Sequence, residues 1–109
     1  MDINELRANI NQTDDELKKL FERRMETSAD IARYKSERDM PVLDRSRERE
    51  IIDRVTHGQS EEMAGYTRVL YNTLFDLSRS YQSRRMIYPS RLPDEIEAAL
   101  AATPKTFPA

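Results

Sequence analysis

Apolar residues recur at alternating spacings of three and four over a stretch that runs from about residue 2 to about residue 38. This pattern predicts one long helix with an apolar seam. The seam positions are Ile3, Leu6, Ile10, Thr13, Leu17, Leu20, Arg24, Thr27, Ile31 and Tyr34. Roughly 36 residues at 1.5 Å each give a rod of about 54 Å, whereas a domain of this size has a radius of gyration of about 13 Å. The chain alone is too small to cover the rod, so we expect the helix to pair with a second copy of itself.

The composition leads to the same expectation. The chain has 109 residues, of which 38% are hydrophobic and 35% are charged. A single small domain of this polarity buries little core by itself. Because the apolar residues are spaced periodically rather than scattered, association as a homodimer is a better interpretation than disorder.

The remaining sequence divides into two more helices and a tail. Pro41 is expected to end the first helix, and Asp44 to cap a second one that closes at Gly58. A third helix is predicted from about residue 60 to about residue 85, with a short helix at 94–102 and a linker at 103–109. No strand pattern is present, so the fold class is all-α with three helices per chain.

Several classes of function are disfavoured. Cysteine is absent and His57 is the single histidine, which argues against a thiolate nucleophile and a metal site. The net charge of −2 lacks the positive excess of a nucleic-acid binder, and the arginines at 45–54 alternate with acids that can pair with them. No apolar run approaches the ~20 residues of a membrane span, and residues 1–6 do not resemble a signal peptide. We expect a cytosolic protein that contacts neither nucleic acid nor membrane.

Two cations stand on the inward face of the first helix. Arg24 occupies a seam position, and Lys35 follows eleven residues later on nearly the same face. A buried guanidinium is costly unless an anion meets it. The pattern therefore predicts either internal salt bridges or an anionic ligand.

Arg7 lies seventeen residues before Arg24, which is about 26 Å along the rod. One small ligand cannot touch both residues of one helix. Arg7 is either a surface residue or, if two first helices pair antiparallel, a residue that approaches Arg24 of the other chain.

Polar residues on the other two helices form smaller groups. At the start of the second helix, Asp44 and Glu48 share a face, with Arg47 one turn from Asp44. These acids are either a cap and a first-turn acid or ligands of a substrate. Ser78 and Gln82 lie at the edge of the third apolar stripe, and mark either a helix end in solvent or a pair of hydrogen-bonding groups.

Taken together, the spacing of these eight polar residues resembles the all-helical class of chorismate mutases. The resemblance covers about residues 3–85, and its most specific block is PVLDRSRER at 41–49. It implies an intertwined homodimer with two equivalent sites that uses no cofactor and no metal. It also implies a helical mutase domain at 1–85, while the tail at 86–109 resembles the linker that precedes prephenate dehydratase in bifunctional proteins.

The resemblance further implies roles for the catalytic residues in converting chorismate to prephenate. Lys35 and Gln82 would donate to the ether oxygen of the substrate. Arg24 would bind a carboxylate, and Glu48 would hold the ring hydroxyl. The reaction is pericyclic, so it needs restraint of the substrate and preorganised charge rather than a nucleophile.

Four residues are implied to assist in binding the substrate. Arg7 of the partner chain would bind a carboxylate, and Ser78 would assist. Asp44 would lie near the ring hydroxyl, and Arg47 would support the acids. Three alternatives are an isochorismate-pyruvate lyase of the same fold, a helical dimerisation module without activity, and a nucleic-acid binder.

Overall fold

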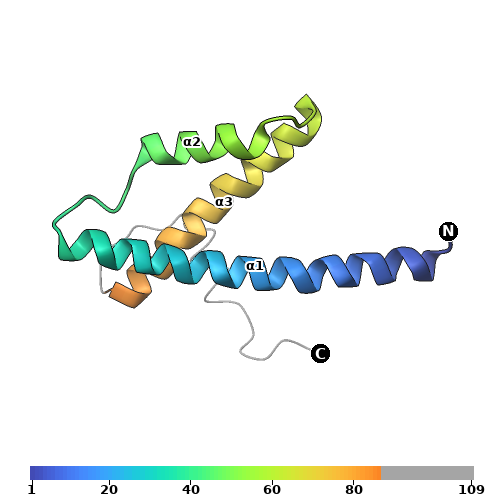
Figure 1. Ribbon diagram of the computed structural model, residues 1–109, viewed down its shortest axis with the longest axis horizontal. Coiled ribbons are helices and arrows are strands. Elements are labelled where there is room, and N and C mark those ends of the chain that lie inside the picture. The colour runs from blue at the N-terminus through green and yellow to red at the C-terminus, as the bar shows by residue number, and fades with distance from the viewer. Residues whose placement is uncertain (87–109) are drawn as a thin grey trace.

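The computed structural model describes residues 1–86, which form three helices: α1 (Ile3–Glu37), α2 (Arg45–Thr56) and α3 (Glu61–Met86) (Figure 1). The described part of the chain contains no strand, which confirms the all-α fold class. None of its helices is long and apolar enough to cross a membrane. The short helix expected at 94–102 and the linker expected at 103–109 lie outside the described residues.

α1 is terminated by local hydrogen bonding. At its start, Asp2 accepts a hydrogen bond from the backbone N–H of Glu5 at 2.8 Å. At its end, Asp39 adopts a left-handed conformation with φ of 53°, and the backbone N–H of Met40 donates to the carbonyl of Lys35 at 2.8 Å. This closure is a Schellman turn. It corrects the expectation that Pro41 ends the helix, because the turn at Asp39 has already done so.

The caps of the other two helices follow from the sequence. Asp44 Oδ1 accepts from the backbone N–H of Arg47 at 3.0 Å, so Asp44 caps α2 as predicted. Gly58 has a φ of +81°, the left-handed conformation expected for the residue that closes α2. Ser60 Oγ accepts from the backbone N–H of Met63 at 3.2 Å and caps α3.

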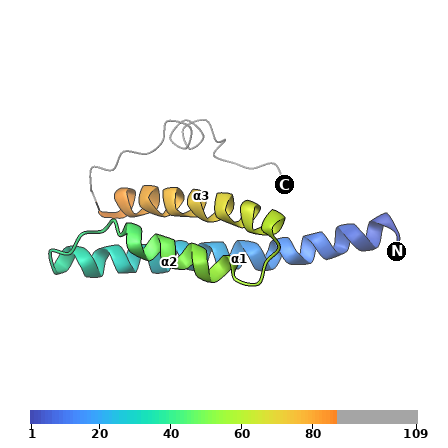
Figure 2. The same cartoon turned by 90° about the horizontal axis from the view of Figure 1, so that it is seen from above.

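The three helices form two layers. α1 and α2 lie in one layer, and α3 runs across them in the other (Figures 1 and 2). The core is small and lies where the second half of α1 meets α3. Ala29 and Ala32 of α1 are buried there together with Phe75 of α3, while Ala64 is buried in the first turn of α3, near the end of α2 (Figure 1). The two alanines are small enough to allow α3 to approach α1 closely.

The first half of α1 extends beyond the other helices (Figure 1). Every residue from 1 to 23 is exposed. The apolar seam residues of this half keep between 44% and 60% of their surface exposed, and they are Ile3, Leu6, Ile10, Leu17 and Leu20. In the second half the seam residues Ile31 and Tyr34 are also 50% and 54% exposed, whereas α3 covers the neighbouring face of the helix at Ala29 and Ala32.

Candidate active site

A cleft of about 300 Å³ lies between the second half of α1, the start of α2 and the second half of α3. Residues of all three helices and of the segment between α1 and α2 line it. Seven of the eight residues predicted from the sequence are among them, namely Arg24, Lys35, Asp44, Arg47, Glu48, Ser78 and Gln82. The fold thus brings together polar residues that are up to 58 positions apart in the sequence.

The cleft is strongly cationic, although the chain has a formal net charge of −2. Five basic side chains line it, from Arg24, Lys35, Arg47, Arg54 and Arg79. Among the described residues, two acidic side chains, those of Asp44 and Glu48, line it with them. Such a cleft favours a ligand that carries more than one negative charge.

Arg24 projects from α1 toward α3. Its Nη1 donates to Ser78 Oγ at 3.2 Å, and its guanidinium lies 5.6 Å from the ring centre of Tyr71 and 5.7 Å from that of Phe75. Ser78 is buried, and its hydroxyl also contacts the sulfur of Met25 at 3.8 Å. Among residues 1–84, no carboxylate forms an ion pair with Arg24. The guanidinium is therefore held by neutral groups, which leaves its charge available to an anion.

Lys35 lies in the last turn of α1, where the Schellman turn binds its carbonyl. It is partly buried and lines the same cleft as Arg24. Within residues 1–84 it too lacks an ion pair with a carboxylate. Neither cation therefore forms an internal salt bridge within residues 1–84, which was one of the two interpretations of the sequence pattern.

Gln82 is held by a residue that the sequence did not single out. Its Nε2 donates to the backbone carbonyl of Ser28 at 2.9 Å and to the Ser28 hydroxyl at 2.7 Å. These two bonds use both hydrogens of the amide. Ser28 lies one turn after Arg24 on α1, so its spacing from Arg24 was the available signal.

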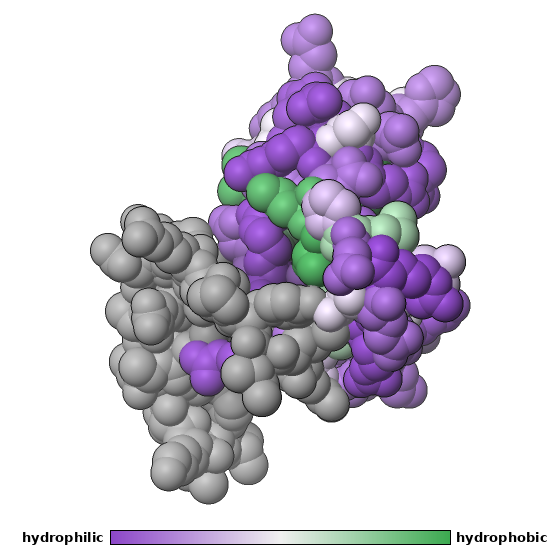
Figure 3. Space-filling model, turned by 90° about the vertical axis from the view of Figure 1, so that its left-hand side faces the viewer, coloured by the Kyte–Doolittle hydropathy of each residue, from purple (hydrophilic) through white to green (hydrophobic). Residues whose placement is uncertain are grey.

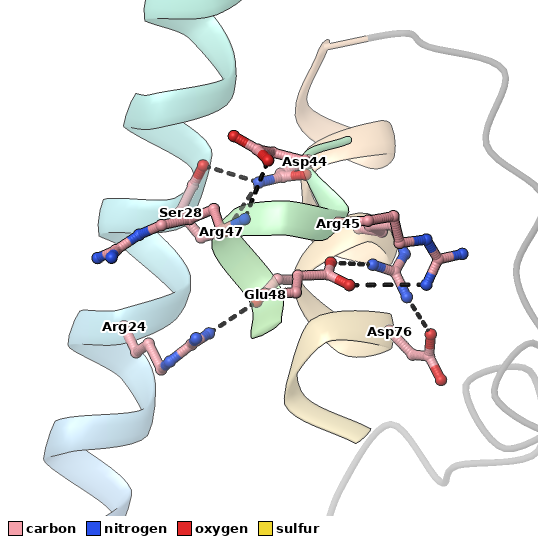
Figure 4. Close-up of polar contacts among 10 residues, drawn as sticks. Arg24, Ser28, Asp44, Arg45, Arg47, Glu48 and Asp76 are labelled. Carbon is pink, nitrogen blue, oxygen red and sulfur yellow. Dashed lines mark hydrogen bonds and ion pairs between the residues drawn. The ribbon is translucent and has the colours of Figure 1, made fainter. Parts of the chain in front are cut away.

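The start of α2 faces α1 across the cleft (Figure 4). The carboxylate of Asp44 is occupied by its capping bond to the backbone of Arg47. The guanidinium of Arg47 pairs with Glu50 at 3.2 Å, and both side chains are exposed. The contact between Arg47 and Asp44 is therefore made by the backbone, while the charged end of Arg47 meets a different acid.

Glu48 is bound by two arginines. Its Oε2 lies 2.5 Å from Nη1 of Arg79 on α3, and its Oε1 lies 3.6 Å from Nη1 of Arg45 on α2. Arg79 in turn binds Asp76, one turn earlier on α3. Arg79 is a site residue missing from the sequence prediction, although its position between Ser78 and Gln82 is a signal that could have found it. The two pairs made within α2, Arg45–Glu48 and Arg47–Glu50, confirm the expected pairing of charges along that helix.

Arg7 is the one predicted site residue that the cleft does not include. It lies on the exposed first half of α1, about 26 Å along the helix from Arg24. A single chain therefore does not bring Arg7 to the other site residues.

On the face shown in Figure 3, the coloured residues are mostly hydrophilic, with a small area of hydrophobic surface among them. The cleft itself has the same mixture, since Ile31, Val42, Leu43 and Ile51 line it together with the charged residues. Such apolar walls suit the carbon skeleton of a small ligand, and the polar groups between them fix its orientation.

The described residues thus combine an all-helical fold with a cleft rich in basic side chains, which suits an anionic ligand. A family model for chorismate mutase type II matches residues 6–83 of the chain. The chain belongs to this family. The protein is accordingly an isomerase of aromatic amino acid biosynthesis that converts chorismate to prephenate. No curated protein and no solved structure matches the chain at a significant level.

Proposed function

We propose that the cleft between the three helices is the site of the rearrangement. The observation that carries this proposal is the pair formed by Arg24 and Lys35, which line the same cleft without a carboxylate partner among residues 1–84. Chorismate is a dianion, so two such cations complement it. The match to residues 6–83 supports a helical mutase domain that occupies about residues 1–85.

The substrate carboxylates are assigned to the arginines. Arg24 presents a fork of donors from between two aromatic rings, where Ser78 orients it. A second carboxylate needs another cation, and we assign it to Arg7 of a second copy of the chain. Arg47 lines the cleft and adds positive charge at the α2 side.

The breaking ether bond is assigned to Lys35 and Gln82. Negative charge grows on the ether oxygen in the transition state, and fixed donors aimed at that position lower the barrier. Gln82 reaches this oxygen by giving up its bond to the Ser28 hydroxyl while its bond to the Ser28 carbonyl keeps the amide in place. The ammonium of Lys35 supplies a full positive charge beside it.

The ring hydroxyl is assigned to Glu48, with Asp44 nearby. Glu48 has one carboxylate oxygen, Oε1, that forms no short hydrogen bond within the described residues. This oxygen can accept the hydroxyl and fix the ring. Holding the ring at one end and the enolpyruvyl arm at the other favours the compact conformation that reacts, which is an entropic contribution.

The active form is proposed to be an intertwined homodimer with two equivalent sites. The exposed seam of α1 gives each chain an apolar surface to bury against the other. If two α1 helices pair antiparallel, the first half of one lies beside the second half of the other. Arg7 then approaches Arg24 of the partner, which completes each site in trans. A cytosolic location remains a prediction from the sequence.

An assay on the purified protein tests the function directly. Chorismate and isochorismate are supplied in parallel, and the loss of each is followed by absorbance while the products are identified. We expect loss of chorismate with prephenate as the product. Release of pyruvate from isochorismate at a higher kcat/KM would instead assign the protein to the lyase class.

A further inference from the structure

We propose that Arg79 is a positioning residue that prepares Glu48 to bind the ring hydroxyl of chorismate. The proposal rests on the role assigned to Glu48 above and adds a residue from a different helix to it. Arg79 lies on α3, whereas Glu48 lies on α2.

The geometry fixes the guanidinium of Arg79 at both ends. Its Nη1 lies 2.5 Å from Oε2 of Glu48, and its Nη2 donates to Asp76. All three side chains are partly buried, with 28% of Arg79, 20% of Glu48 and 33% of Asp76 exposed. A planar guanidinium that binds two carboxylates in this way has little freedom to rotate.

The two oxygens of Glu48 are consequently not equivalent. Oε2 is occupied by Arg79, whereas Oε1 lies 3.6 Å from Arg45, which is beyond hydrogen-bonding distance. Arg45 is 68% exposed, so it holds the carboxylate only loosely. Arg79 holds Oε2, so Oε1 is the oxygen that can exchange its loose contact with Arg45 for the substrate hydroxyl.

Arg79 also offsets a charge that opposes binding. Glu48 is one of two acids in a cleft that has to admit a dianion. A carboxylate without a partner would repel the carboxylates of the substrate, and the adjacent guanidinium reduces this repulsion. Arg79 therefore allows an acid to serve as an acceptor in a site that is otherwise selective for anions.

A purely structural role for the same pair is the competing explanation, because Arg79 also links α2 to α3. The two roles differ in their effect on substrate preference. A structural link would affect every substrate equally, whereas a positioning role depends on the ring hydroxyl. The informative comparison is kcat/KM for chorismate against kcat/KM for an analogue in which hydrogen replaces this hydroxyl.

The test measures this preference in the wild type and in Arg79→Met, which keeps an unbranched, flexible side chain but removes its charge and its hydrogen-bond donors. We expect kcat/KM for chorismate to fall about 10- to 100-fold, as is typical of a misplaced contact group, with a much smaller loss for the analogue. Arg79→Lys should restore part of the preference, since the ammonium keeps a cation beside Glu48. Arg45→Met is the matched control, because it removes the other arginine near Glu48, and its effect should be the smaller one.

Equal losses for both substrates in Arg79→Met would overturn the proposal in favour of a structural link. If Arg79→Met does not form the native oligomer, as judged by circular dichroism and size-exclusion chromatography, Arg79→Gln replaces it, and a wild-type preference there overturns the proposal. Glu48→Ala, which removes both acceptor oxygens, distinguishes failure of Arg79 from failure of Glu48. A lowered preference in Glu48→Ala with a normal one in Arg79→Met refutes only Arg79, whereas a normal preference in Glu48→Ala removes the role of Glu48 and this inference with it.

Discussion

The two halves of α1 carry the same heptad pattern but differ in their surroundings. In the second half, α3 covers the helix, Ala29 and Ala32 are buried, and Arg24 and Lys35 line the cleft. In the first half, no residue up to position 23 is buried, and the apolar seam faces outward (Figure 1). Even in the second half, the seam residues Ile31 and Tyr34 remain 50% and 54% exposed, so α3 covers a face of α1 beside the seam and not the seam itself.

The comparison also bears on Arg7, which we propose to act in the cleft of a second chain. The half of α1 that is covered by α3 supplies most of the predicted polar residues of this helix. The uncovered half carries Arg7, which has no route to the cleft of its own chain. If a partner chain covers the first half, pairing of the two chains both buries the seam and brings Arg7 to the partner's cleft.

The largest expected effect comes from disrupting the exposed seam. Ile10 is 60% exposed in one chain, so Ile10→Asp would be nearly neutral for an independent monomer. In the proposed dimer it places a charge in an apolar interface, and we expect dissociation, loss of folded structure at micromolar concentration and loss of activity. Analytical ultracentrifugation and circular dichroism measure this result. Asn11→Asp, which lies off the seam, is the control, and an active, compact Ile10→Asp monomer would contradict the dimer.

The next largest effect is expected from the cations in the covered half of α1. Arg24→Ala and Lys35→Ala should each lower kcat/KM by at least about 100-fold, which corresponds to about 2.7 kcal/mol of lost transition-state stabilisation. Neither residue forms an ion pair with a carboxylate of residues 1–84, so the thermal stability of the protein should change far less than its activity. Near-normal kinetics in either variant would remove that residue from the site.

The fold was predictable from the sequence where local interactions determine it. The caps at Asp44 and Gly58 depend on residues within one turn of each other, and both were identified correctly. The end of α1 was assigned to Pro41 because aspartate is a weaker signal than glycine for a left-handed residue, although Asp39 makes this turn.

The candidate site was predictable only in part, for a related reason. The positions of Arg24, Lys35 and Gln82 follow from spacing along single helices and from a resemblance to a family. Ser28 and Arg79 act across helices, on Gln82 and Glu48 respectively. Such contacts depend on how α3 crosses α1 and α2, and the periodicity of one helix contains no information about that crossing.

A smaller but more specific effect is expected when the two halves of α1 are mutated in separate chains. Arg7→Ala and Arg24→Ala proteins are each expected to be impaired, and they are then mixed under conditions that exchange subunits. In the mixed dimer both lesions fall in one site, which leaves the other site intact, so activity should recover toward half of wild type per mixed dimer. Mass spectrometry of differently labelled chains establishes that exchange has occurred. Absence of recovery after proven exchange would show that Arg7 does not act in trans.

The smallest effect concerns Gln82, and it is also the effect that depends most on the pH. Gln82 lies on α3 and contacts the second half of α1 at Ser28. Its amide donates to both oxygens of Ser28, and an amide donates at every accessible pH. A glutamate at this position can donate only when protonated, with a reference pKa of about 4.3 that burial raises. Once ionised, it would also face the Ser28 carbonyl, which is another acceptor.

We therefore expect Gln82→Glu to keep substantial activity only at the acidic end of the range and to lose it as the pH rises through the pKa of the new carboxyl group. Wild-type kcat/KM should show no such requirement for a protonated acid between about pH 5 and pH 8. Parallel pH profiles of the two proteins measure this difference, and chromatography at each pH checks that both keep the same oligomeric state. Ser28→Ala is a useful companion, because it removes the hydroxyl acceptor but keeps the backbone carbonyl that anchors the amide. If Gln82 merely ended a helix in solvent, Gln82→Glu would follow the wild-type profile throughout, and the donor to the ether oxygen would have to be Lys35 alone.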